Sequence, residues 1–410
     1  MDKNIIEIKK LFLIFGRERN KAFRMLMSGK CKNEILKESG CTIAVNNVNL
    51  SIKKGEIFVI MGLSGSGKSS LIRCINRLNK PTFGKILING RDIAKATEEE
   101  LRSIRRKELA MVFQHFGLLP HYTVLQNIAF GLELQNIEKK EREQKSLESM
   151  RLVGLNGYEN QMVNELSGGM QQRVGLARAL ANDPAVLLMD EAFSALDPLI
   201  RVQMQDELLA LHSKMKKTIL FITHDLEEAI KLGDRIAIMR DGEIQQIGTS
   251  EEILTEPAND YVKCFVENVD RSRIVTASSI MADKPLVARW GKEGPEVLIR
   301  KMKERKLTVL PVVDADGILM GEVRLKDLVR LRKERVLTID SVVRNEVHSV
   351  LGDTVVEDIL PLMTQTNSPI WVVNENREFE GVVPLSSLII EVTGKDKGEI
   401  KEIIQNAIEL

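Results

Sequence analysis

The sequence lacks long hydrophobic runs, and this bears on where the chain works. No apolar stretch approaches the roughly 20 residues that a membrane-spanning helix needs. The most apolar ones, residues 57–63 and 218–223, have the length of buried strands. The first ten residues alternate charge with isoleucine and contain no signal-peptide core. We therefore expect a cytoplasmic chain that works at a membrane only if something else holds it there.

The sequence also contains few cysteines and has a net charge close to zero. The four cysteines show no CxxC spacing and no paired histidine cluster, so a disulfide framework or a zinc site is not expected. Lysine and arginine number 59 against 58 aspartate and glutamate, a net charge of +1. A strongly basic nucleic-acid binder is thereby excluded for the chain as a whole, and we expect no nucleic-acid target.

The order of patterns along the first part of the chain indicates an α/β fold. Short fully apolar runs, typical of strands buried on both faces of a parallel sheet, alternate with helical segments. The length of 410 residues allows two to four domains. We place the first domain at residues 1–270. Expected strands cover 5–15, 43–60, 185–189 and 218–223, and expected helical segments cover 17–38, 122–165, 172–182 and 261–269.

A glycine-rich loop is the first motif that carries chemistry. Residues 62–69 match G-x-x-x-x-G-K-[ST], after an apolar strand and before a helical run. Glycines let backbone N–H groups converge on phosphate oxygens, and the helix N-terminus favours negative charge. Lys68 would reach the β- and γ-phosphates, and the Ser69 hydroxyl would ligate Mg²⁺. The residues predicted to bind ATP here are Gly62, Leu63, Ser64, Gly65, Ser66, Gly67, Lys68, Ser69 and Ser70.

Two further segments extend this site. The apolar run 187–189 ends in Asp190, suited to holding Mg²⁺, and Glu191, suited to act as general base for water. Ser167, Gly168 and Gly169 open a second helix and form another anion-binding N-terminus. Because one triphosphate needs one such loop, the second loop predicts a site shared between two copies of the chain.

In this order the motifs resemble those of the ATP-binding subunits of ABC transporters. The family landmarks are the phosphate loop, Gln114, the segment 166–170, the pair 190–191, the D-loop 194–197 and His224. Met170 replaces the more usual glutamine of the signature segment. The implied fold is an α/β P-loop ATPase with a RecA-like core and a helical subdomain.

The resemblance also implies roles for single residues. Gln114 would touch Mg²⁺ and the water, and His224 would contact the γ-phosphate. Phe15 lies where the family places an aromatic ring on adenine, although a core phenylalanine at the end of a strand fits it about as well. Ser167, Gly168 and Gly169 would close on ATP bound to the second copy, and Gln171 and Asp197 are also predicted to bind the nucleotide.

The last third of the chain contains an internal duplication. Residues 311–314 are echoed at 371–374 and residues 321–329 at 381–389, both at an offset of 60. Each copy predicts a helix, a strand, a turn, a strand and a helix. The pair resembles tandem CBS repeats of βαββα type. We assign repeat one to 271–335, repeat two to 336–393 and a tail to 394–410.

One subgroup of the family combines these features with an insertion at 17–41 and the segments 116–121 and 170–184. The chain resembles the ATP-binding subunit of glycine betaine/proline betaine importers. This implies ATP hydrolysis coupled to import, at the cytoplasmic face of the membrane. The implied partners are a second copy and a transmembrane permease, in some cases fused to a substrate-binding domain. The permease would dock near 116–123, where Leu118, Leu119 and Pro120 form either a contact surface or a core turn.

Three alternatives remain open from the sequence. A choline or carnitine importer would leave the same motifs, because the ATPase does not touch the transported molecule. A soluble ABC ATPase is a rival from another class, although the chain has one cassette and no heptad run. A nucleotide sensor without turnover is a third, against which Glu191 argues.

Charge is uneven across the repeats. Residues 271–335 carry 16 Lys and Arg against 9 Asp and Glu, a net +7, whereas 336–393 carry 2 against 9, a net −7. The basic run 300–306 is either a solvated helix face or a docking site for anionic lipid, whose attraction weakens as salt rises. The second interpretation predicts sensing of ionic strength.

The repeats also raise the question of a nucleotide ligand. The Gly–Thr–Asp pattern that contacts ribose in such repeats lacks its threonine at Gly321, Arg324 and Asp327. It lacks both its threonine and its aspartate at Gly381, Pro384 and Ser387. AMP-type binding is therefore not favoured, and cyclic di-AMP remains an open alternative.

Overall fold

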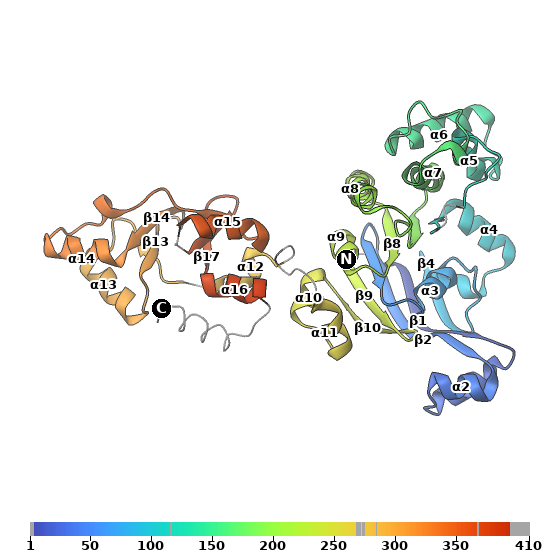
Figure 1. The fold of residues 1–410 in the computed structure, drawn as a ribbon, viewed down its shortest axis with the longest axis horizontal. Coiled ribbons are helices and arrows are strands. Elements are labelled where there is room, and N and C mark those ends of the chain that lie inside the picture. The colour runs from blue at the N-terminus through green and yellow to red at the C-terminus, as the bar shows by residue number, and fades with distance from the viewer. Residues whose placement is uncertain are drawn as a thin grey trace. The chain divides into compact units, whose positions relative to one another are not determined.

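The computed structural model describes residues 4–114, 117–267, 272, 275–283, 285–366 and 369–393. Contacts within the chain divide it into two units, Met1–Val266 and Glu267–Leu410. The boundary expected after residue 270, the end of the helix expected at 261–269 and the expected tail 394–410 lie outside the described residues. Figure 1 shows both units as ribbons.

A six-stranded sheet in the order β10-β9-β3-β8-β7-β6 forms the centre of the first unit. All its neighbouring strands are parallel except the edge strand β10, which is antiparallel to β9. β3, β7 and β8 are buried along their whole length, as their apolar runs predicted. The strands are β3 Ile57–Met61, β6 Leu109–Val112, β7 Val186–Asp190, β8 Thr218–Thr223, β9 Arg235–Arg240 and β10 Glu243–Gly248.

An antiparallel sheet in the order β2-β1-β4-β5 forms a second layer. Its strands are β1 Asn4–Phe15, β2 Thr42–Lys53, β4 Phe83–Ile88 and β5 Arg91–Asp92. The strand character expected over 43–60 is divided between β2 and β3, which belong to different sheets, and β3 has the bounds of the apolar strand expected before the phosphate loop. The chain turns at Gly55, whose φ of 80° is readily adopted only by glycine.

Helices complete the first unit, and several begin at a side chain that caps the free backbone N–H groups. Ser167, Asp197 and Asp225 cap α7, α8 and α9. Because of its cap, α7 begins four residues before the expected 172. The helices are α3 Lys68–Ile75, α4 Glu98–Lys107, α5 Val124–Glu133, α6 Lys139–Leu152, α7 Gly168–Ala181, α8 Pro198–Met215, α9 Leu226–Leu232, α10 Ser250–Thr255 and α11 Asp260–Val266, with 3₁₀ turns at Ile93–Lys95 and Val163–Glu165.

Helices α5, α6 and α7 pack on one another as a separate group, which Figure 1 shows in green and teal at one end of the unit. The inserted segment lies at the other end and folds as two helices, α1 Arg19–Met27 and α2 Lys32–Ser39. Ala22 and Ile35 are buried against Ile14 and Ile43 of the antiparallel sheet. The insertion is therefore an integral part of the ATPase unit. No helix in the described ranges is both long and apolar enough to cross a membrane.

The second unit contains two similar halves. In each half the first strand is parallel to the second, and the second is antiparallel to the third. This is the βαββα order expected for the repeats. The first half comprises β12 Ala288–Arg289, α13 Pro295–Glu304, β13 Val309–Val313, β14 Leu319–Arg324 and α14 Leu325–Lys333; the second comprises β15 Ser349–Leu351, α15 Val356–Thr366, β16 Ile370–Val373, β17 Phe379–Val383 and α16 Leu385–Thr393.

Short elements join the two halves. α12 Ala277–Ile280 and β11 Ala282–Asp283 come first in the chain, yet β11 pairs with β17 of the second half. A 3₁₀ turn at Asp340–Val342 links the halves. The turns before β14 and β17 exchange backbone hydrogen bonds, from Leu319 N–H to Arg377 at 3.1 Å and from Phe379 N–H to Gly317 at 2.9 Å. The two repeats are therefore joined into one structural unit by strand pairing and backbone hydrogen bonds.

Candidate active site

The phosphate loop lies between β3 and α3 and is pressed against two other strands. Gly62 and Gly67 have φ of 152° and 105°. A Cβ on Gly62 would lie 2.1 Å from the carbonyl oxygen of Met239, and one on Gly67 would lie 2.3 Å from that of Ala44. Only glycine fits these two positions, so the motif glycines serve packing as well as phosphate access.

Lys68 is nearly buried, with 4% of its surface exposed. Its ammonium group donates to the carbonyl oxygens of Gly62 at 2.8 Å and Leu63 at 3.1 Å. Burial lowers the pKa of Lys68, and the carboxylates of Glu191 and Asp190 oppose this effect. A cation held inside the loop is suited to meet phosphate oxygens there.

The remaining loop residues predicted to bind ATP have different surroundings. The tip of the loop is exposed at Leu63, Ser64 and Gly65. Ser66 is buried, and Ser70 is half-buried in the first turn of α3.

Ser69 and Asp190 form an oxygen pair suited to Mg²⁺. The Ser69 hydroxyl donates to the Asp190 carboxylate at 2.9 Å, and Arg73 lies 3.6 Å from its other oxygen. Burial raises the pKa of Asp190, while Ser69 and Arg73 lower it. A hydroxyl and a carboxylate are hard oxygen ligands, and Mg²⁺ typically takes few protein ligands beside phosphates. Sequence reasoning missed Arg73, although its spacing of four from Ser69 on a helix indicates a shared face.

Glu191 is the meeting point of the predicted catalytic residues. It follows β7 directly and adopts a φ of 48°, with its N–H donating to Ile222. Its carboxylate accepts from the Gln114 amide at 3.3 Å and lies 3.5 Å from Nδ1 of His224. The structure thus brings together three side chains that are distant in sequence.

Ser194, in the D-loop segment 194–197, joins the site although it is not among the predicted site residues. Its hydroxyl accepts from the Gln114 amide at 3.3 Å and donates to the Glu191 carbonyl at 2.9 Å. It therefore ties Gln114 to the turn that carries Glu191. The D-loop match of residues 194–197 is the signal that could have identified it.

The turn after β8 positions His224. The Thr223 hydroxyl bonds to the buried Glu228 carboxylate and accepts from the N–H of Asp225 at 3.0 Å. Burial raises the pKa of Glu228, and its hydrogen bonds to Thr223 and Gln205 lower it. A buried polar network therefore fixes the backbone on both sides of the histidine.

The second predicted anion site is built around the start of α7. Ser167 accepts from the N–H of Met170 at 3.4 Å, and Gln171 donates to the carbonyl of Leu166 at 3.1 Å. Ser167 and Gly168 are exposed, whereas a Cβ on Gly169 would lie 2.7 Å from Ile200.

Asp197 caps α8 by accepting from the N–H of Ile200 at 3.1 Å. Since the Ile200 side chain borders Gly169, Asp197 lies near the start of α7. Within the ranges that the structure describes, no hydrogen bond or ion pair joins residues 167–171 to the phosphate loop at 62–69. The two anion sites of one chain are thus built separately.

Phe15 lies at the end of β1 with 41% of its surface exposed. It pairs with Thr42, two residues before Ala44, whose carbonyl borders Gly67 of the phosphate loop. It is therefore not a core residue, and its place at the border of the loop is compatible with adenine stacking.

The predicted permease-docking segment is only partly described, since Phe116 lies outside the described residues. Leu118 and Leu119 are half-buried and Pro120 is exposed. The buried Asn127 side chain bonds both backbone groups of Leu119, which ties the segment to the start of α5.

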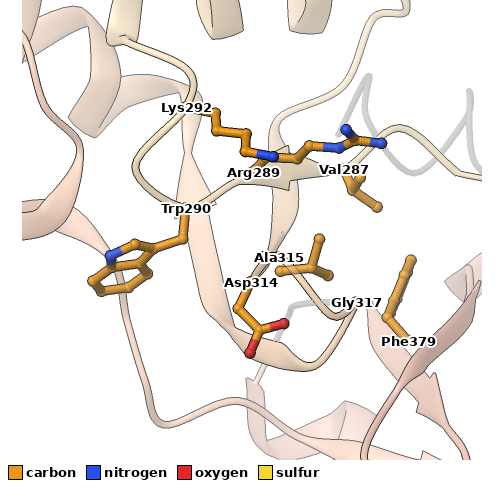
Figure 2. A pocket seen from close by; sticks show the side chains of 9 residues that line it. Val287, Arg289, Trp290, Lys292, Asp314, Ala315, Gly317 and Phe379 are labelled. Atoms are coloured by element: carbon orange, nitrogen blue, oxygen red, sulfur yellow. The ribbon is translucent and has the colours of Figure 1, made fainter.

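The repeats offer a different environment. In the first repeat, Gly321 and Asp327 are the residues of the ribose-contacting pattern that are present. The Asp327 carboxylate forms an ion pair with Arg344 at 3.3 Å. A separate cavity of about 280 Å³ is lined by Trp290, Asp314 and Phe379 among others. Figure 2 shows Trp290 and Phe379 on opposite sides of Asp314, with the Arg289 and Lys292 side chains above. Sequence reasoning did not identify this cavity.

Comparisons with known proteins agree with this geometry. Family models match residues 45–194 as an ABC transporter and residues 293–334 and 339–394 as CBS domains. The chain is 50% identical to the glycine betaine transport ATP-binding protein of Bacillus subtilis, over 96% of this chain and 93% of that one. It is 48% identical to the glycine betaine/carnitine transport ATP-binding protein of Listeria monocytogenes, over 95% and 98%.

A solved structure supports the fold of the first unit. The dimeric structure of a bacterial ABC transporter cassette is 34% identical, with a TM-score of 0.51, over 60% of this chain and 98% of that one. A post-hydrolysis state of the same cassette holds ADP and Pi. The chain therefore belongs to the ABC transporter ATP-binding family and is an ABC ATPase that binds ATP with Mg²⁺ and carries C-terminal CBS domains.

Proposed function

We propose that the chain is the ATP-hydrolysing subunit of an importer for glycine betaine and related quaternary amines. The observation that supports this most directly is similarity over nearly the whole chain to proteins named for glycine betaine transport, at 45–50% identity. The choline transport ATP-binding protein of Bacillus subtilis is 37% identical over 88% of the chain. The betaine assignment is therefore favoured over choline.

The proposed chemistry rests on the carboxylate of Glu191. As general base it takes a proton from the attacking water, which Gln114 contacts, while His224 contacts the γ-phosphate. Lys68 binds the β- and γ-phosphates. When bound to Ser69, Asp190 and Gln114, Mg²⁺ neutralises developing phosphate charge.

The remaining predicted residues position nucleotide. The loop residues Gly62 to Gly67 and Ser70 cradle its phosphates, and Phe15 stacks on adenine. Because the segment around Ser167 is exposed and separate from its own phosphate loop, we propose that it closes on ATP bound to a second copy. The residues supplied to that shared site are Ser167, Gly168, Gly169, Gln171 and Asp197.

The same proposal places the subunit peripherally, on the cytoplasmic side of a transmembrane permease that contacts residues near 116–123. We divide the chain into an ATPase of 1–270, repeats of 271–335 and 336–393, and a tail. Removal of the γ-phosphate would reopen the closed dimer and return the permease to its starting state.

We further propose that the first repeat regulates activity through its basic surface. Nine Lys and Arg side chains on or beside α13 and α14 are exposed: Arg300, Lys303, Arg305, Lys306, Lys326, Arg330, Arg332, Lys333 and Arg335. The neighbouring Leu337 is 85% exposed. A cationic surface with an exposed apolar side chain favours anionic lipid, at about 1 kcal/mol per basic residue.

An assay of substrate-stimulated ATP hydrolysis tests the principal proposal. The chain is reconstituted with its permease in vesicles, and ATP hydrolysis is measured with glycine betaine, choline or carnitine. We expect glycine betaine to stimulate hydrolysis most. Glu191→Gln should lower hydrolysis at least 100-fold while retaining ATP binding, because the amide cannot accept the proton.

Glu98→Gln, an equivalent change at an exposed position, serves as the control and should leave hydrolysis unchanged. Full hydrolysis by Glu191→Gln would refute the base assignment. Stimulation by choline alone would replace the proposed substrate and leave the ATPase chemistry intact.

A further inference from the structure

The turn between β9 and β10 forms the floor of the phosphate loop. The N–H of Gly242 donates to the carbonyl of Ser66 at 2.8 Å, and the carbonyl of Gly242 accepts from Asn46 of β2 at 2.8 Å. A Cβ on Gly67 would lie 3.3 Å from Cα of Gly242. The turn and the loop are therefore in direct contact through backbone atoms.

This contact has a consequence for phosphate binding. In a planar trans peptide the C=O and N–H groups point in opposite directions. Because the Ser66 carbonyl is held toward Gly242, the N–H of Gly67 points away from the turn. The turn thus orients one of the backbone donors that a bound phosphate requires.

A residue of the inserted segment, which contains α1 and α2, also holds this turn. Lys32, the first residue of α2, donates its ammonium group to the carbonyl of Asp241. Asp241 and Gly242 both adopt positive φ, at 50° and 78°. Burial lowers the pKa of Lys32, and the nearby carboxylates of Asp241 and Glu243 oppose this effect. Positive φ at both central residues is the favoured geometry of a two-residue Asp-Gly hairpin turn. The partly buried lysine therefore adds to this turn a side-chain bond that joins it to α2.

We propose that Lys32 is a positioning residue for nucleotide binding: through Asp241 it fixes the β9–β10 turn, and through Gly242 the turn fixes the phosphate loop. The inserted segment thereby sets the fraction of molecules whose phosphate loop is in the conformation that binds phosphate. A lower competent fraction raises the apparent Kd in proportion.

Lys32→Met tests the proposal in the full chain, because it keeps the length of the side chain and removes its donor and charge. We expect the Kd for ADP and for a non-hydrolysable ATP analogue to rise about tenfold, which corresponds to about 1.4 kcal/mol. The KM for ATP should rise with little change in kcat, since the Glu191 site is untouched. Lys32→Arg, which keeps a cationic donor, should restore most of the affinity.

Lys37→Met is the matched control, since Lys37 is an exposed lysine of the same helix. Its Kd should stay within twofold of wild type, and the thermal stability without nucleotide should be the same in both variants. A Kd within twofold for Lys32→Met would overturn the proposal, as would an equal rise in both variants.

Hydrogen exchange on the wild-type chain provides a second test that needs no folded variant. Binding of ADP should slow exchange at Gly242 and in the first turn of α2. Unchanged exchange in both segments, while the phosphate loop itself becomes protected, would overturn the proposal.

Discussion

At the scale of single residues, the phosphate loop allows a test of packing against backbone strain. Gly65 and Gly67 both adopt positive φ, at 81° and 105°, so alanine strains the backbone at either position. Only at Gly67 would the new Cβ also meet a backbone oxygen, at 2.3 Å, whereas Gly65 faces open space. We expect Gly67→Ala to cost about 1–3 kcal/mol more stability than Gly65→Ala, measured by urea unfolding.

Nucleotide affinity should follow the same order. Gly67→Ala moves the loop away from Ala44 and should weaken ADP binding more than Gly65→Ala does. Equal stability and equal affinity of the two variants would show that the loop does not rest on β2 in solution.

At the scale of elements, the turn that carries His224 provides a pH test. The pKa of buried Glu228 is raised, so its contribution to stability is full below the ordinary carboxyl pKa of 4.5 and is lost as pH rises through the raised value. Glu228→Gln removes this loss. The Tm of the variant relative to wild type should therefore increase from pH 5 to pH 8, by about 2–4 °C for each 1 kcal/mol of stability.

Calorimetry of the full chain at several pH values measures this shift. Glu227→Gln, at the exposed neighbouring position, is the control and should give a difference from wild type that does not vary with pH. A relative Tm of Glu228→Gln that falls with pH would mean that the charged carboxylate stabilises the turn.

The elements also show how far the sequence could be interpreted. The buried strands β7 and β8 were predictable because their side chains are apolar on both faces. The apolar run of β3 was also predictable, but its separation from β2 into another sheet was not, since periodicity does not report which sheet a strand joins. The contact of Lys32 with Asp241 spans 209 positions, and no local pattern marks it. Ser167 and Asp190 were found because helix starts and strand ends leave local signals.

At the scale of the whole molecule, a net charge near zero conceals opposed repeats of +7 and −7. The basic run 300–306 begins on α13, whose apolar residues Leu298, Ile299 and Met302 are buried. Arg300, Lys303, Arg305 and Lys306 are exposed and face solvent, where they can meet an anionic surface, whereas Lys301 is half-buried and pairs with Glu293. Since the Debye length shortens from about 10 Å at 0.1 M to about 3 Å at 1 M, such an attraction is sensitive to cytoplasmic salt.

The chain reconstituted with its permease in vesicles rich in anionic lipid should hydrolyse ATP faster as internal salt rises. Combining Arg300→Gln, Lys303→Gln, Arg305→Gln and Lys306→Gln should flatten this dependence, because four of the cations that bind lipid are lost. The control neutralises four exposed cations of the ATPase unit, Lys95, Arg102, Arg106 and Lys107, and should keep the dependence. An unchanged salt response in the first variant would refute lipid docking by this surface. A response to added cyclic di-AMP that persists in neutral-lipid vesicles would instead favour regulation by a nucleotide.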